Sequence, residues 1–135
     1  IMLKKILSIS GKPGLYKLIS QGRNMLIVES LKEQKRMPAY AHEKILSLGD
    51  IAMYTEEGEV PLNEVMNSIK EKENGKLINI DLKKADSKVL SEYMKEILPT
   101  YDKDRVYVSD MKKLFSWYNL LVETNNDNFE KEETK

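Results

Sequence analysis

The stretch VPLNEVMNSIKEKENG, residues 60–75, decides the fold, because the spacing of the apolar residues changes there. Four of them follow one another at the intervals of a helix face: Leu62, Val65, Met66 and Ile69. Pro61 suits a first helical turn, and Asn74-Gly75 suits a helix end. Before residue 60 the apolar residues come in short runs separated by turns. The sequence therefore predicts an α+β protein, with a β half followed by a helical half.

Five runs rich in strand-forming residues precede residue 60. They cover residues 5–10, 15–20, 25–29, 35–40 and 50–55. Turn signals such as Pro13-Gly14 separate them, and short runs joined by glycine-containing loops are typical of hairpins. Pro38 predicts an edge strand or a barrel corner for the fourth run, and residues 42–48 are expected to form a short helix. We expect residues 1–59 to form a small SH3-like β-barrel or a curled antiparallel sheet.

Residues 60–123 are expected to form a three-helix unit. The second helix is predicted to begin at Asp86 or Ser87 and to stop before Pro99, and Ser109 is predicted to cap the third. Residues 77–81 read as a short strand or an extended connector. Residues 124–135 are polar and hold one apolar residue, Phe129, so we expect a disordered tail.

The composition indicates where in the cell the protein functions and which chemistries it lacks. The 135 residues include 41% hydrophobic residues, which is enough for a core, and no cysteine. Disulfides and thiolate chemistry are therefore excluded. No apolar run reaches the ~20 residues of a membrane span, and the first residues lack the apolar stretch of ~7–15 residues that a signal peptide needs. We expect a cytoplasmic protein without a membrane partner.

The charge is unevenly distributed, although the net charge is zero. Residues 1–54 carry nine basic and four acidic residues, which is typical of a polyanion partner or of two halves that attract one another. Seven residues form the candidate nucleic-acid surface: Lys12, Tyr16, Lys17, Arg23, Lys35, Arg36 and Tyr40. Basic and aromatic residues of small barrels neutralise phosphate and stack bases. An ordinary solvated sheet face carries the same residue types.

The third predicted helix is apolar on nearly all sides. A helix of this kind is either buried or meets another surface. Four aromatic residues at or near it form the candidate partner surface: Tyr107, Phe115, Trp117 and Tyr118. The alternatives are packing within the chain, binding of another protein and assembly with further copies of the chain.

Two short motifs resemble known sites and depart from them at the decisive positions. Residues 9–14, ISGKPG, lack the first glycine of a phosphate loop and have Pro13 where serine or threonine is needed. Residues 102–113 space three aspartates like a calcium loop, but Tyr107 replaces the central glycine and Lys113 replaces the terminal glutamate. We interpret the first motif as a turn and the second as an inter-helix loop.

The sequence supplies little for catalysis. His42 is the only histidine, so a metal site would need carboxylates alone for its other ligands. No nucleophile elbow or glycine-rich oxyanion segment accompanies it. We expect neither a catalytic site nor a metal or other cofactor.

Three segments resemble a family of short, uncharacterised proteins from Bacteroidetes bacteria. They are LKKILSISGKPGLY (residues 3–16), LGDIAMYT (residues 48–55) and DRVYVSD (residues 104–110). The resemblance extends to about Val122 and implies a bacterial cytoplasmic origin, but no activity, cofactor or site residue. The residue patterns themselves predict a non-catalytic binding or adaptor module for a macromolecule. The alternatives are an RNA- or DNA-binding regulator acting through the basic face, and a homo-oligomeric structural protein.

Overall fold

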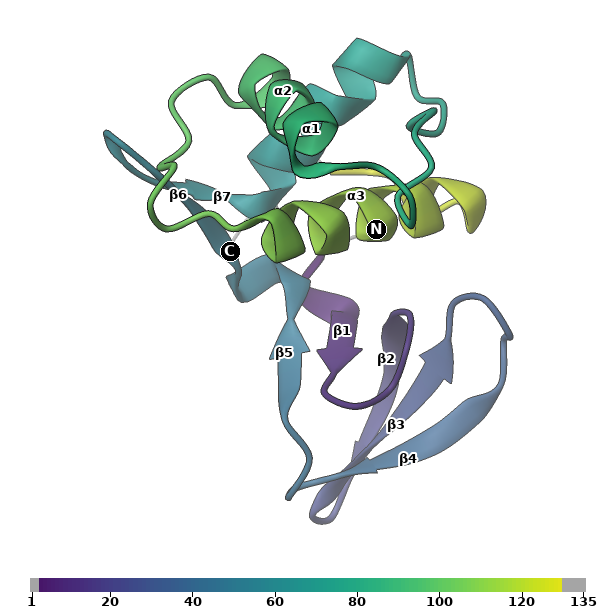
Figure 1. Ribbon diagram of the computed structural model, residues 1–135. Coiled ribbons are helices and arrows are strands. Elements are labelled where there is room, and N and C mark those ends of the chain that lie inside the picture. Colours follow the sequence, from purple (N-terminus) through teal and green to yellow (C-terminus); the bar gives the residue numbers. More distant parts are fainter. Residues whose placement is uncertain (1–2, 130–135) are drawn as a thin grey trace.

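The computed structural model describes residues 3–129, and its N-terminal half is one antiparallel sheet in the order β4-β3-β2-β1-β5 (Figure 1). After a 3-10 turn, η1 (Leu3–Lys5), the strands are β1 (Ile6–Ile9), β2 (Tyr16–Gly22), β3 (Met25–Ser30), β4 (Arg36–Tyr40) and β5 (Ile45–Ser47). β4 and β5 are the two edges, and no ladder joins them within residues 3–129. The antiparallel sheet is confirmed, whereas the SH3-like barrel does not close.

Turn residues fix the hairpins of this sheet. β2 and β3 are joined by a two-residue turn, Arg23-Asn24, in which Asn24 adopts φ 59°, a value that asparagine tolerates well. The ISGKPG motif lies at the end of β1 and in the β1–β2 loop, where Gly11 and Gly14 have φ values of 83° and 79°. A strand follows it, not a helix, so the motif is a turn.

The two faces of the sheet differ in composition. The inner face carries a small core of its own, made by Leu7, Ile9, Tyr16, Val28 and Ala39. On the outer face, the register aligns Lys17 with Glu29 and Glu29 with Arg36 across three strands. The alternation of strand side chains therefore separates an apolar face from a partly charged one.

The segment after β4 differs from the prediction. Residues 42–48 are predicted to form a short helix, but residues 42–47 form a turn and the short strand β5, because β5 pairs with β1 and completes the sheet. A second 3-10 turn, η2 (Leu48–Asp50), leads into a separate hairpin of β6 (Ala52–Thr55) and β7 (Gly58–Pro61). This hairpin contacts the first helix and does not extend the five-stranded sheet.

The three helices are α1 (Leu62–Glu73), α2 (Ser87–Ile97) and α3 (Val108–Glu123). α1 ends as predicted, with Asn74 at φ 55° followed by Gly75. The Asp86 carboxylate caps α2 by accepting a hydrogen bond from the Val89 amide at 2.9 Å. The cap of α3 is Tyr107, two residues before the predicted Ser109, and the Asp110 carboxylate accepts a hydrogen bond from the Tyr107 amide at 2.9 Å. Residues 77–81 are an extended connector.

The helices do not form an independent three-helix unit. Their core also contains Leu3, Ile6, Leu15 and Leu48 from the β half, together with the β6–β7 hairpin. α3 lies between the other helices and the sheet in Figure 1. The two halves therefore share one large hydrophobic core.

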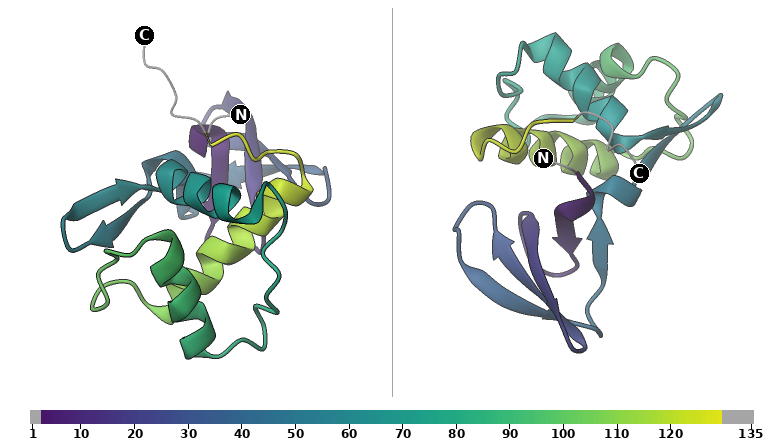
Figure 2. Two further views of the ribbon diagram at one scale, coloured as in Figure 1. Left: turned by 90° about the horizontal axis from the view of Figure 1, so that it is seen from above. Right: turned by 180° about the vertical axis from the view of Figure 1, so that it is seen from behind.

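The C-terminal segment is ordered as far as the structure describes it. After α3 the chain turns back along the helix (Figure 2), and Phe129 is 1% exposed. The side-chain amides of Asn63 and Asn67 donate to the Phe129 carbonyl at 3.2 and 3.3 Å. Residues 124–129, part of the tail predicted to be disordered, thus have partners on α1; residues 130–135 of that tail lie outside the described part. No helix within residues 3–129 has the length and apolar character to cross a membrane.

Candidate binding site

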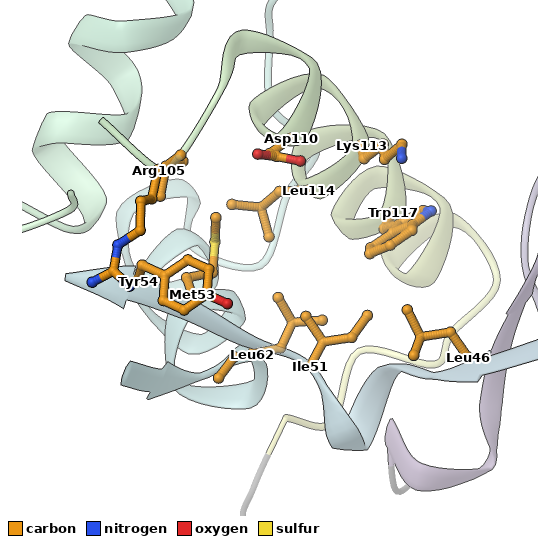
Figure 3. A pocket seen from close by; sticks show the side chains of 12 residues that line it. Leu46, Ile51, Met53, Tyr54, Leu62, Arg105, Asp110, Lys113, Leu114 and Trp117 are labelled. Carbon is orange, nitrogen blue, oxygen red and sulfur yellow. The ribbon is translucent and has the colours of Figure 1, made fainter. Parts of the chain in front are cut away.

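A pocket of about 240 Å³ lies where β5, β6 and α3 meet (Figure 3). We call it the junction pocket. Its lining residues are Leu46, Ile51, Ala52, Met53, Tyr54, Leu62, Arg105, Val106, Asp110, Lys113, Leu114 and Trp117. Most of the lining is apolar, and the pocket is partly open to solvent.

Helical periodicity places one wall of the pocket. Asp110, Lys113, Leu114 and Trp117 follow one another at intervals of three, one and three residues, which brings them to one side of α3. The opposite wall comes from the chain between β5 and β6, with Leu46 and Ile51 facing α3 in Figure 3. The pocket therefore depends on how the two halves pack together.

The pocket has a buried floor and an exposed apolar rim. Leu62, Val106 and Leu114 are all under 5% exposed and form the floor. At the rim, Leu46 is 51% and Tyr54 is 40% exposed, which is high for large apolar side chains. An apolar ligand would remove both from water.

The three charged lining residues differ in their partners. Arg105 Nε lies 2.9 Å from Asp102 Oδ2, and its guanidinium stacks 4.4 Å above the Tyr54 ring centroid. This hydrogen bond from Arg105, aided by the Asp104 amide, lowers the pKa of Asp102. The Asp110 carboxylate accepts a hydrogen bond from the Tyr107 amide. Lys113 is exposed and has no ion-pair partner among residues 3–129.

The predicted partner surface divides between core and solvent. Phe115 is fully buried, edge-to-face with Tyr93 at 5.0 Å between ring centroids. Tyr118 is also fully buried, and its hydroxyl donates to the Lys76 carbonyl at 2.8 Å. Trp117 lines the junction pocket, and Tyr107 is 63% exposed beyond it. Two of the four residues are thus available to a partner.

The candidate nucleic-acid residues are only partly assembled on one surface. Lys17, Arg36 and Tyr40 share the outer face of the sheet, although Arg36 Nε lies 3.2 Å from Glu29 Oε1. Arg23 is exposed in the turn at one end of this face, and Lys35 is exposed in the loop at the other end.

The remaining two candidates lie elsewhere. Tyr16 is 6% exposed on the inner face, where its hydroxyl donates to the Pro13 carbonyl at 3.3 Å, so it offers no ring for stacking on bases. Lys12 Nζ lies 3.1 Å from Glu43 Oε1. The Tyr40 amide and Lys12 together lower the pKa of Glu43. The Lys12 charge is therefore compensated within the chain.

His42 is exposed and stacks on Tyr40, with ring centroids 6.0 Å apart. Within residues 3–129, no three histidine, aspartate or glutamate side chains gather closely enough to hold a metal ion. In the loop before α3, Asp102 binds Arg105 and Asp110 caps the helix.

Sequence reasoning missed most of the junction pocket. The sequence predicts a helix at Leu46, and Tyr54, Arg105 and Lys113 lie far apart in the sequence. The one available signal was the spacing of Lys113 and Trp117 on α3, which places a lysine beside the single tryptophan.

Two family models match the chain, and the boundary between the matched segments lies close to the junction pocket. Residues 3–48 match a family model described as "Domain of unknown function (DUF5606)", and residues 51–121 match "Domain of unknown function (DUF6852)". A solution NMR structure of a protein from Bacteroides vulgatus is similar, with 61% sequence identity and a TM-score of 0.77. The match covers 92% of this chain and 88% of that chain. No curated protein matches the chain.

Proposed function

The chain belongs to the family of Bacteroidetes proteins that carry the domains of unknown function DUF5606 and DUF6852, and we propose that it is a non-catalytic binding module that recognises a protein partner through the junction pocket. The family resemblance seen in the sequence is thereby confirmed. Leu46 is the one lining residue of the junction pocket within residues 3–48, the segment that matches DUF5606. The other lining residues lie within residues 51–121, the segment that matches DUF6852.

The observation that carries the proposal is the exposed apolar rim around a partly open pocket. Leu46 and Tyr54 share the lining with Trp117, the single tryptophan of the sequence, and with Lys113, a cation that has no ion-pair partner among residues 3–129. Protein interfaces concentrate their binding energy where a large apolar side chain fills such a pocket and water is excluded around it. A pocket of this kind suits a protein partner, which we expect to meet the chain in the cytoplasm.

The size of the pocket favours an anchoring side chain over a small-molecule substrate. Pockets for drug-sized ligands run from about 300 to 1,000 Å³, and the junction pocket holds about 240 Å³. Its polar groups do not converge on one point, since Arg105 and Asp110 are engaged with neighbours within the chain. The geometry therefore favours recognition over catalysis.

Site-specific photo-cross-linking in the native host tests the proposal. A benzophenone amino acid at position 54, where it replaces the 40% exposed ring of Tyr54 at the rim and leaves Lys113 in place, should yield a discrete adduct with another protein, whereas the same group at position 112 on α3 should not. Leu46→Lys should reduce the yield at position 54 at least fivefold, because it charges the rim at a side chain 51% exposed. Equal yields at both positions, or a yield indifferent to Leu46→Lys, would contradict the proposal.

A nucleic-acid partner is the second candidate, favoured by Lys17, Arg36 and Tyr40 on one sheet face. Binding of a fluorescent oligonucleotide should then fall steeply with salt, and Lys17→Gln and Arg23→Gln should weaken it uniformly across sequences. Undetectable or salt-insensitive binding would exclude this candidate. The pairing of Arg36 with Glu29 and of Lys12 with Glu43 argues for the first proposal.

Self-association through α3 is the third candidate. Burial of Phe115 and Tyr118 leaves Tyr107 and Trp117 as the members of the candidate partner surface that lie near solvent. Light scattering at high protein concentration distinguishes the cases: a monomer supports a separate partner, and a defined oligomer that Trp117→Ala disrupts supports self-association.

A further inference from the structure

The hairpin strand β6 has one edge that the chain covers only in part. β7 pairs with one edge along its length. On the other edge, residues 100–102 add a short strand: the Glu56 amide donates to the Thr100 carbonyl at 2.8 Å, and the Asp102 amide donates to the Tyr54 carbonyl at 2.9 Å. Thr55 and Tyr101 form the bridge between them.

This added strand ends before it reaches Ala52. The chain turns away after Asp102, with the amides of Arg105 and Val106 donating to the Asp102 carbonyl. Because main-chain groups alternate between the two edges of a strand, the N–H and C=O of Ala52 point the same way as the Tyr54 carbonyl. On the opposite edge Ala52 faces Pro61 in a pair that exchanges no hydrogen bonds, as this alternation requires.

The junction pocket lies along this stretch of the edge. Ala52, Met53 and Tyr54 line it from β6, and Arg105 and Val106 line it from the turn where the added strand leaves. An extended segment placed there would lie between β6 and α3, with main-chain groups of Ala52 within its reach. Addition of a strand beside an apolar pocket is a recurrent mode of peptide recognition.

We propose that the junction pocket binds an extended peptide segment of a protein partner, which continues along β6 the strand that residues 100–102 begin. The segment pairs with the main chain of Ala52 and places a large apolar side chain in the pocket. A carboxylate of the same segment meets Lys113. This inference rests on the proposed function and specifies the chemistry of the partner.

The charge of Lys113 supports the proposal that the partner's segment carries an acidic residue. Among the charged lining residues, Lys113 alone lacks a partner within residues 3–129, and it stands one helical turn from Trp117. A carboxylate next to the apolar anchor would pair with it at the rim, where charges steer association and select partners.

A phage-displayed library of random dodecapeptides is the probe. Peptides enriched on the wild-type protein should combine a large apolar residue with aspartate or glutamate within about three positions, since neighbouring extended residues rise about 3.3 Å each. A synthetic enriched peptide should change the fluorescence of Trp117, the only tryptophan and a pocket residue.

Two variants separate the parts of the interaction. Ala52→Pro removes the donor at the β6 edge and should weaken the peptide at least tenfold; Ile51, at φ −90° and ψ 139°, already has the extended conformation that precedes proline. Lys113→Glu should weaken it at least fivefold, whereas Lys112→Glu, its neighbour on α3, should leave binding within twofold of wild type. Circular dichroism melts check that each variant folds.

Amide exchange in the wild-type protein gives a readout that needs no variant. The Ala52 amide should exchange at least tenfold more slowly when the peptide is bound, because it becomes a donor in the new ladder. Unchanged exchange with intact binding, or full affinity of a folded Ala52→Pro, overturns the strand addition and leaves the proposed function standing.

Other outcomes would contradict the proposed function as well as the strand addition. Library selection that enriches no peptide, or peptides that leave Trp117 fluorescence unchanged, contradict both the inference and the proposed function. Slowing of the Ala52 amide by protein concentration alone identifies a second copy as the occupant and overturns the separate partner.

Discussion

Two buried tyrosine hydroxyls donate to different acceptors at the centre of the helical layer. Tyr93 donates to Glu73 Oε2 at 2.5 Å, and Tyr118 donates to the Lys76 carbonyl at 2.8 Å. Loss of hydration raises the pKa of both; the hydrogen bond to Glu73 adds to the effect at Tyr93, and the negative charges of Glu73 and Asp127 add to it at Tyr118. The pKa of Tyr118 rises to about 12.

These pKa shifts predict a loss of stability in alkali. An unfolded tyrosine ionises near pH ~10, while folded Tyr118 keeps its proton to about pH 12. The raised folded pKa therefore stabilises the protein fully below pH ~10, and this stabilisation is lost as the pH rises from ~10 through about 12. Urea unfolding at a series of pH values should show this decline in the free energy of unfolding.

Tyr118→Phe isolates the contribution of one hydroxyl. At neutral pH it should cost about 1 kcal/mol through loss of the hydrogen bond to Lys76. Its decline in alkali should be shallower than that of the wild type, because one ionising group is gone. Tyr40→Phe, at a ring 47% exposed, is the matched control. An alkaline decline as steep in Tyr118→Phe as in the wild type would contradict the assignment.

At the scale of elements, the C-terminal segment behaves like a peptide docked on α1. Phe129 packs against Tyr118, with ring centroids 6.0 Å apart, while Lys70 Nζ lies 5.8 Å from the Phe129 ring centroid and donates to the Asp127 carbonyl at 2.8 Å. A ring 1% exposed with these contacts is part of the core.

Phe129→Ala should therefore destabilise the protein strongly. Truncation of a buried phenylalanine costs about 3–5 kcal/mol, since it removes apolar contacts and leaves a cavity. Leu77→Ala, at a side chain 42% exposed, should cost much less. Chemical denaturation followed by circular dichroism measures both. A loss below about 1 kcal/mol for Phe129→Ala would show that the segment is not held on α1 in solution.

Elements with strong local signals were predictable from the sequence. The apolar stripe of α1, the cap at Asp86 and the glycine-containing turns between strands each act within a few residues. The sequence predicts a helix at β5, and this prediction fails because the strand is formed by pairing with β1, 38 residues away in the register Leu46–Ser8. The docking of Phe129 depends in the same way on distant partners, Asn63 and Asn67.

The candidate site was less predictable than the fold for a related reason. Composition shows that α3 is apolar on nearly all sides, but only packing decides that Phe115 faces the core while Trp117 borders solvent. Tyr16 and Tyr40 likewise lie in the same half, yet strand alternation puts them on opposite faces of the sheet. Sequence identifies residue types suited to binding, and the tertiary fold selects among them.

At the scale of the whole molecule, the two halves meet where the two family models adjoin. Gly49 lies between the matched segments and packs against the main chain of η1. A Cβ atom at Gly49 would lie 2.7 Å from both the N and the Cα atom of Lys4. The Ser47 hydroxyl also keeps this part of the chain close to η1, because it donates a hydrogen bond to the Lys4 carbonyl at 2.6 Å.

Gly49→Ala should consequently destabilise the whole protein by about 1–3 kcal/mol, because backbone must move to relieve the contact. Gly22→Ala is the control, since its Cβ would meet Met25 at an ordinary 3.5 Å. The shared core of Ile6, Leu15 and the helices predicts that helical circular dichroism, Trp117 fluorescence and the amide signals of the sheet shift together in denaturant. Separate transitions for sheet and helices would mean that the halves unfold independently, and the junction pocket would then lack a fixed geometry for its partner.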